Sequence, residues 1–396
     1  MTSLAPEAGG AARPDQAAPA PSREHRAPRS VPPAAGTTLL APHLRDGLDL
    51  RRAMACVLVA VTPGAGVGIA NAGHQALLAA RELGLDRLPG WRGGLLVALG
   101  LPPAPQSALA CLVYGLACAL PVLAVAALVA WGWDRVFARL RDRAPCEALP
   151  VVVVLLCLLL PPAIALWQVA LGASVAYVVG LAIFGGTGRN PVHPALVGFS
   201  FLYFAYPASF SGPGAWVALD GARAVPPLAA LADGGFGVVE TSWLDTLLGR
   251  TPGGLGETSA LACLLGGAFL VYAQLASWRV IAGGVLGLVA TALLANGLGD
   301  PERPLVGVPW HWHLTLGSFA FGLVFLATDP VTSAATRAGR WVYGGLIGFL
   351  TVLIRVFNPA HAEGALMAIM LANVLAPLFD HVVVRAHVRR RRRRLG

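Results

Sequence analysis

Apolar segments separated by short polar junctions make up most of the chain beyond residue 52. Each runs for roughly 15 to 25 residues, near the ~20 that a helix needs to cross a bilayer at about 1.5 Å per residue. The pattern predicts about ten transmembrane helices, at 53–72, 107–131, 149–163, 166–184, 192–207, 258–276, 280–296, 313–328, 341–357 and 364–379. The third and fourth are short and joined by Pro161-Pro162, so a helical hairpin is expected there. The expected fold is an all-α polytopic membrane protein.

Composition agrees with this class. Of the 396 residues, 56% are hydrophobic and 12% charged, and the mean hydropathy is +0.67. The basic residues behind the net charge of +9 are all arginine, and in a membrane protein such an excess indicates cytoplasmic loops rather than nucleic-acid binding. The six cysteines form no C-x-x-C pair, so their spacing predicts neither a zinc site nor an iron–sulfur site.

Arginine placement predicts the orientation. With the N-terminus in the cytoplasm, most arginines fall on inner loops, whereas the largest outer loop, 208–257, carries several acids: Asp220, Asp233, Glu240 and Asp245. Residues 1–40 are rich in Ala, Pro and Gly, which is typical of a disordered tail and unlike a cleaved signal peptide. The chain is thus expected to comprise that tail, a transmembrane domain at 41–384, and an Arg-rich cytoplasmic tail at 385–396 that contacts anionic lipid.

Short sequence echoes predict an internal repeat. SALACL occurs at 107–112 and again at 259–264, opening the second and sixth segments. Asn190-Pro-Val and Asp329-Pro-Val close the fourth and eighth. Their order and membrane direction agree, so we expect two four-helix repeats related by an axis along the membrane normal.

Several carboxylates stand at the ends of expected helices: Asp134, Asp329, Glu363 (in the junction with Asn358 and His361) and Asp380. A charge in such a place is costly unless it is hydrated, paired or bound to a cation. These acids therefore either sit in interfacial water or form a path for a hard cation such as sodium. Arg355, inside an expected helix, needs a partner, and one of these acids is the expected one.

Four motifs carry a family resemblance: ATDPVTS, TRAGRWVYGGLIGFLTVLIRV, NPAHAEG and LANVLAPLFDH. They resemble the NqrB/RnfD family, and within it the sodium-pumping NADH:quinone reductase type more than the Rnf type. The resemblance extends from about His43 to the C-terminus. It implies a multi-pass subunit of the bacterial inner membrane that relays electrons through bound flavins, riboflavin and FMN, towards quinone and couples this to sodium or proton movement. Partner subunits would supply the NADH or ferredoxin chemistry, because the chain has no dinucleotide-binding fingerprint in context and is not catalytic alone.

The resemblance also implies cofactor contacts on two segments. A non-covalent riboflavin would lie at the glycine-rich segment 184–194, where Thr187, Asn190 and His193 are the candidates, His193 replacing a family asparagine. Seen without the resemblance, this segment is a glycine turn between helices. The motif Gly-Glu257-Thr258-Ser would lie beside FMN, although a Ser or Thr before a helix also suffices as an N-cap.

The family's FMN is esterified to the Thr of a D-G-x-x-G-A-T run, and here the matching run is Asp220-Gly-Ala-Arg223-Ala-Val-Pro226. Proline has no hydroxyl, so covalent FMN is not expected at Pro226. Either FMN binds without a covalent bond, with Arg223 as a phosphate partner, or the flavin has been lost.

The family's quinone-site motif, Gly-Gly-aromatic-Trp-Glu, corresponds to a run from Ala130 and Trp131 to Asp134. Ala130 and Trp131 replace the two glycines here and fill space that a quinone headgroup would need, which argues against quinone reduction. For the cation, the resemblance implies a path through Asp329, Glu363 and Asp380. The rival hypothesis is a non-redox paralogue, a transporter or membrane scaffold on the same fold, and an RnfD-type subunit is a further alternative.

Overall fold

The computed structural model describes residues 49–395 apart from Asp86, Pro213, Glu240, 300–302 and 359–362. The expected tail at 1–40 and the side chains of Glu240 and His361 therefore lie outside the described residues. Within the described part every regular element is helical. Five helices there are long and apolar enough to cross a membrane: α1 (Leu50–Glu82), α3 (Ala108–Leu140), α11 (Trp278–Leu298), α14 (Arg337–Phe357) and α15 (Ala365–Leu395). The expectation of an all-helical membrane protein is confirmed.

Shorter apolar helices fill the remaining expected segments. They are α4 (Leu149–Leu159), α5 (Leu166–Tyr177) continued by the π-helical η1 (Val178–Ala182), α6 (Pro194–Ala205) and α10 (Ala260–Tyr272). The segment expected at 313–328 is divided into α12 (Trp310–Thr315), α13 (Phe319–Phe321) and the π-helical η4 (Gly322–Leu326). Because the shorter helices span only 10–17 residues, the number of ten crossings stays a prediction.

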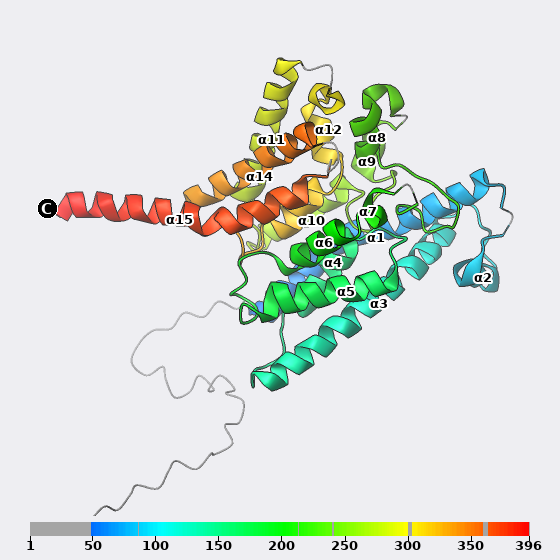
Figure 1. Cartoon of the computed structure of the whole chain (residues 1–396), viewed down its shortest axis with the longest axis horizontal. Coiled ribbons are helices and arrows are strands. Elements are labelled where there is room, and N and C mark those ends of the chain that lie inside the picture. The colour runs from blue at the N-terminus through cyan, green and yellow to red at the C-terminus, as the bar shows by residue number, and fades with distance from the viewer. Residues whose placement is uncertain are drawn as a thin grey trace, which may run out of the picture.

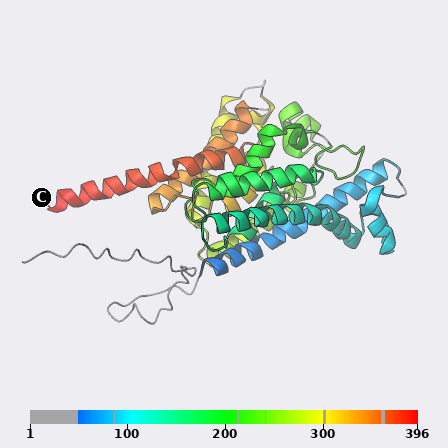
Figure 2. The same cartoon turned by 60° about the horizontal axis from the view of Figure 1, so that its bottom comes forward.

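The long helices form two groups with the short ones between them (Figure 1). Helices α1 and α3 run side by side on one flank, and α11, α14 and α15 pack together on the other. The Arg-rich end of α15 projects away from the body in both views (Figure 2). Smaller elements lie in the connections between these helices: α2 (Gly90–Ala98), α7 (Ala208–Ser211), α8 (Pro227–Gly234), η2 (Gly235–Val238), α9 (Trp243–Leu248) and η3 (Pro304–Gly307).

Glycine permits the close approach of neighbouring helices. In α1, a Cβ on Gly73 would collide with the Cys111 carbonyl of α3, and Gly115 of α3 stands in the same relation to Ile69. Helices in a bilayer gain little from the hydrophobic effect between themselves, so this backbone proximity and the dispersion contacts it allows hold the pair together.

The chain breaks its helix between α12 and α13, where Leu316, Gly317 and Ser318 are not helical. Gly317 has a φ of +63°, a conformation that favours glycine. Both cut ends find polar partners. The guanidinium of Arg355 donates from its two terminal nitrogens to the carbonyls of His313 and Leu316, each at 2.7 Å. At the other end, the Ser318 N–H donates to Glu363 Oε1 at 2.9 Å.

Arg355 is fully buried, and the partners that the described structure gives it are main-chain carbonyls. The expected pairing with an acid is therefore replaced by closure of a helix C-terminus, with Glu363 near enough to interact electrostatically. A helix end inside a membrane protein leaves carbonyls without partners, and a buried guanidinium supplies both donors and a charge that suits the helix dipole.

We expect Gly73→Ala to lower the free energy of unfolding by about 1–3 kcal/mol, because the new methyl group must push α1 from α3. Denaturant titration of the purified protein in detergent measures this. Gly66→Ala is the matched control: it lies on the same helix, exposed, with open space around its Cβ, and should leave stability equal or slightly higher. Equal behaviour of the two variants would contradict the packing argument.

We expect Arg355→Met to cost about 3–5 kcal/mol of stability, because it orphans two carbonyls and leaves the nearby carboxyl without its cation. The control is Arg337→Met, an exposed arginine on the same helix, which should change the same unfolding transition by less than about 0.5 kcal/mol. A similar cost for both variants would show that the broken helix does not depend on the guanidinium.

Candidate functional site

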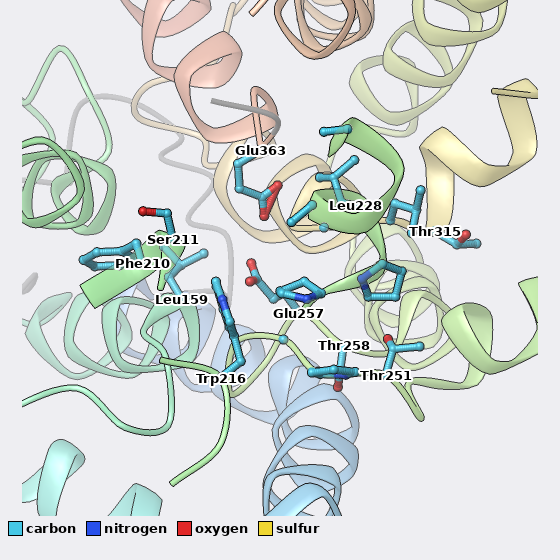
Figure 3. Close-up of a pocket in the computed structure, with 18 of the residues that line it drawn as sticks. Leu159, Phe210, Ser211, Trp216, Leu228, Thr251, Glu257, Thr258, Thr315 and Glu363 are labelled. Atoms are coloured by element: carbon cyan, nitrogen blue, oxygen red, sulfur yellow. The ribbon is translucent and has the colours of Figure 1, made fainter. Parts of the chain in front are cut away.

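A cavity of about 290 Å³ opens at the face formed by the loop 208–257, which we call the loop face. Figure 3 shows side chains from several elements directed into it, among them the carboxyl groups of Glu257 and Glu363. Its wall is made by residues far apart in sequence: Leu159, Phe199, Tyr203, Phe210, Ser211, Trp216, Pro226–Ala229, Ala232, Asp233, Thr251–Gly253, Glu257, Thr258, Thr315–Gly317 and Glu363.

Glu257 is held by a glycine-rich loop that precedes α10. Its carboxyl accepts the Gly254 N–H at 3.2 Å, and a Cβ on Gly254 would lie only 2.7 Å from the same oxygen. The loop is fixed in turn to the end of α4, because the N–H groups of Leu255 and Gly256 donate to two of its last carbonyls, those of Leu160 and Leu158. The short helix α4 thus ends on the loop that carries the acid.

Glu363 reaches the cavity from the junction between α14 and α15. Besides accepting the Ser318 N–H, its carboxyl rests against Gly317, where any Cβ would collide with it. The glycine in WHLTLGSF is therefore required twice, for its backbone conformation and for the space that the acid occupies.

The two carboxyl groups perturb each other. Burial raises the pKa of Glu257 well above its usual value, and the charge of Glu363 raises it further, with the Gly254 N–H opposing. Burial likewise raises the pKa of Glu363, while Arg355 and the bond from Ser318 act in the opposite direction. Like charges in a poorly solvated site disfavour double ionisation.

The hydroxyl of Thr258 is buried and has no hydrogen-bond partner in the described structure. The N-cap of α10 is the next residue, Ser259, whose side chain accepts the Ala262 N–H at 3.2 Å. The capping interpretation therefore applies to Ser259 and leaves Thr258 with a polar atom at the wall of the cavity.

Pro226 is the residue that precedes α8, and it lines the same cavity. The structure thus brings together four of the residues selected from the sequence: Pro226, Glu257, Thr258 and Glu363. Asp220 and Arg223, the other two candidate residues of the Asp220–Pro226 run, do not line this cavity. Asp220 lines a separate cavity of about 430 Å³ with Trp91, Arg92 and Tyr114, and Arg223 is exposed.

This arrangement does not suit the phosphate of FMN. The charged side chains on the described cavity wall are acids, namely Glu257, Glu363 and Asp233, and Arg223 does not line it. Pro226 offers no hydroxyl for a phosphoester. A dianionic group would meet like charges with no cation on the described wall, so the residues present do not fit this cofactor.

At the opposite end of the molecule, Asp134 is enclosed by its own partners. It accepts two contacts from the Cys146 N–H at 3.2 Å and one from the Tyr177 hydroxyl at 2.7 Å, and Arg143 lies 3.7 Å away. Thr187 joins this cluster through Cys146, whose Sγ lies 2.9 Å from the Thr187 hydroxyl. Of the other proposed quinone residues, Ala130 is buried and Trp131 is exposed, with its ring against Arg135.

His193 and Asp329 line one small cavity, of about 40 Å³, together with Thr328. His193 Nδ1 accepts the Ala195 N–H at 3.3 Å, and Asp329 accepts from the N–H and the hydroxyl of Thr332 at 3.1 and 3.0 Å. Asn190 is turned towards its own loop, where it donates to the Val192 carbonyl.

Two of the three acids of the expected cation path, Asp380 and Glu363, lie at opposite ends of α14, whereas Asp329 lines the small cavity with His193. Asp380 accepts from the N–H groups of Ala335 and Thr336 and from the Thr336 hydroxyl, just before α14 begins, whereas Glu363 follows its end. At 1.5 Å per residue the 21-residue helix separates them by about 30 Å. Asp380 and Glu363 therefore do not form one binding site, and a path between them would run the length of α14.

Sequence reasoning missed several residues of the cavity, including Thr315 and Gly317. The signal was present in a glycine between two short polar side chains inside an otherwise apolar segment, which is typical of a broken helix. Trp216 and Tyr203, which also line the cavity, carry no such signal, because aromatic residues are common throughout membrane segments.

Comparison with known proteins identifies the family. The family model for the NQR2, RnfD, RnfE family matches residues 37–389. Similar proteins include the NqrB subunit of the Na(+)-translocating NADH-quinone reductase of Pseudomonas aeruginosa (strain LESB58), 45% identical over 91% of this chain and 90% of that one. The corresponding subunits of Yersinia pestis (44% identical, 89% of each chain) and Azotobacter vinelandii (46%, 90% of each) are further examples. The chain belongs to the NQR2, RnfD, RnfE family.

Proposed function

We propose that the chain is the membrane subunit of an Nqr-type redox-driven cation pump, relaying electrons through bound flavin towards quinone while sodium or protons cross the membrane. The observation that carries this is the similarity, at about 45% identity over nine-tenths of each chain, to the NqrB subunits of Na(+)-translocating NADH-quinone reductases. Partner subunits of the complex supply the electron donor. In the bacterial inner membrane, both termini face the cytoplasm and the loop face is outer.

The proposal includes ten membrane crossings in two four-helix repeats. Its support is that a helical segment lies at each of the ten expected positions. The π-helical segments η1 and η4 also fall in the corresponding fourth and eighth segments, ending eight positions before Asn190 and three positions before Asp329. Discontinuous helices line ion and substrate sites in other membrane folds, and the helix break at Gly317 lies at the wall of a cavity.

For the ligands, we assign riboflavin to the segment of Thr187, Asn190 and His193, and the approach of quinone to Ala130, Trp131 and Asp134. Flavin supplies one- and two-electron transfer when bound. The cation would pass Asp329, Asp380 and Glu363, whose carboxyl oxygens are the ligands that hard cations prefer. The rival is a non-redox transporter or scaffold on the same fold, and the specific observations that favour it are Pro226 and the acidic cavity wall.

The experiment that separates these functions uses the chain purified without reductant. A relay subunit should carry flavin absorbance in the native protein and lose the colour on denaturation and filtration, because its flavin is not covalently bound. A colourless protein that moves a cation across proteoliposomes without an electron donor would support the transporter instead. The native and denatured samples are read in the same spectrophotometer against free riboflavin.

We expect no flavin fluorescence on the chain in a denaturing gel, because the position that matches the family's esterified threonine is Pro226. An NqrB subunit from one of the relatives named above whose sequence retains the threonine, prepared in parallel from cells with its own attachment machinery, serves as the positive control. A fluorescent band in the wild-type chain that disappears only when another hydroxyl residue is removed would show attachment elsewhere and would refute the interpretation of Pro226.

A further inference from the structure

The cavity at the loop face has more carboxyl groups than cationic side chains near it. Two carboxyl groups, of Glu257 and Glu363, point into it, and the cation behind its wall is Arg355. Glu257 is buried, Glu363 partly buried and Arg355 fully buried. If both acids were ionised, one negative charge would remain uncompensated in a poorly hydrated site, which is costly.

We infer that Glu257 and Glu363 share a single proton, so that the pair carries one negative charge, offset by Arg355, and serves as a proton-holding site open to the loop face. This goes beyond the proposed function and holds whether or not the chain carries flavin. The fold is built for such a pair, since each carboxyl accepts a main-chain N–H, from Gly254 and Ser318. Each therefore keeps oxygen lone pairs available for the shared proton.

The other groups around the pair fit this assignment. Thr258 places an unpartnered hydroxyl at the same wall, available to donate to the ionised member. Asp233, also on the wall, is exposed, so the cavity communicates with water at the loop face. A second negative charge at its mouth further disfavours double ionisation of the pair.

Further titratable groups on the described packed elements are Cys157 on α4, Tyr203 on α6, Cys263 on α10, and His311 and His313 on α12, of which His311 lines a different cavity. Cys263 donates to the Gly256 carbonyl, and His313 is buried beside Arg355, its main-chain carbonyl being one of the two that the guanidinium closes. None of these adds a second fixed positive charge next to the carboxyl pair. Among the described residues, the charge balance therefore rests on one arginine and one proton.

Infrared titration of the full-length chain in detergent tests the assignment, with glutamate isotopically labelled so that the protonated-carboxyl band is attributed to glutamate. At neutral pH the wild type should show one such band, decreasing as the pH rises through the raised pKa of the pair. Glu257→Gln should abolish the band, because the remaining Glu363 carboxyl is then compensated by Arg355. Glu363→Gln should keep a band that disappears at a lower pH than in the wild type, because the like charge is removed while Glu257 stays buried. Glu147→Gln, which alters a partly exposed acid outside the cavity, should leave the band unchanged.

Two results would overturn the inference. Persistence of the band in Glu257→Gln would assign the proton to Glu363 alone, and an unaltered titration in Glu363→Gln would assign it to Glu257 alone, rather than to the pair. Loss of the wild-type band on replacing choline by sodium at constant pH would make an alkali cation the occupant. This second arm needs no variant, so the inference can be tested even where a substituted chain does not fold.

Discussion

A broken helix inside a membrane protein needs partners for its exposed main-chain groups, and the fold depends on how this chain provides them. Arg355 closes the end of α12 through two carbonyls, and Glu363 receives the first N–H of the following segment. Arg355 lies in the last turn of α14, and Glu363 lies in the junction between α14 and α15. The junction therefore fixes the break, and the break places Gly317 at the cavity.

The other wall of the cavity is likewise fixed by hydrogen bonds to the main-chain groups of a helix end. Helix α4 ends early, and its carbonyls are satisfied by the loop that carries Glu257. Both acids are consequently attached to helix ends rather than to helix faces, which gives each a main-chain donor and little freedom. The ends of interrupted helices form the site, and the long helices around it fix the positions of these ends relative to one another.

Much of this could be predicted from the sequence. Apolar length located a helical segment at every expected position, because hydrophobic thickness imposes a length on each span. The motif residues Glu257, Thr258 and Glu363 proved to share a cavity with Pro226. What could not be predicted were matters of relative placement, such as the separation of Asp220 from Pro226, only six positions apart, by a turn with Gly221 at a φ of +82°. Similarly, the carbonyl partners of Arg355 could not be predicted, because those carbonyls are free to accept a hydrogen bond only where the helix breaks.

What the cavity can bind at Pro226 depends on the charges around this residue. In the family resemblance its position carries a phosphoester, whereas the cavity in this chain presents two carboxyl groups, an exposed aspartate and, on the described wall, no basic side chain. Removal of the hydroxyl and an acidic wall both act against an anion at this place. The carboxyl groups of this cavity outnumber the one cation behind its wall, Arg355, so a further positive species is needed to balance their charge. A proton is the smallest such species and needs no further ligands. We therefore expect this cavity to favour a cation over a phosphate.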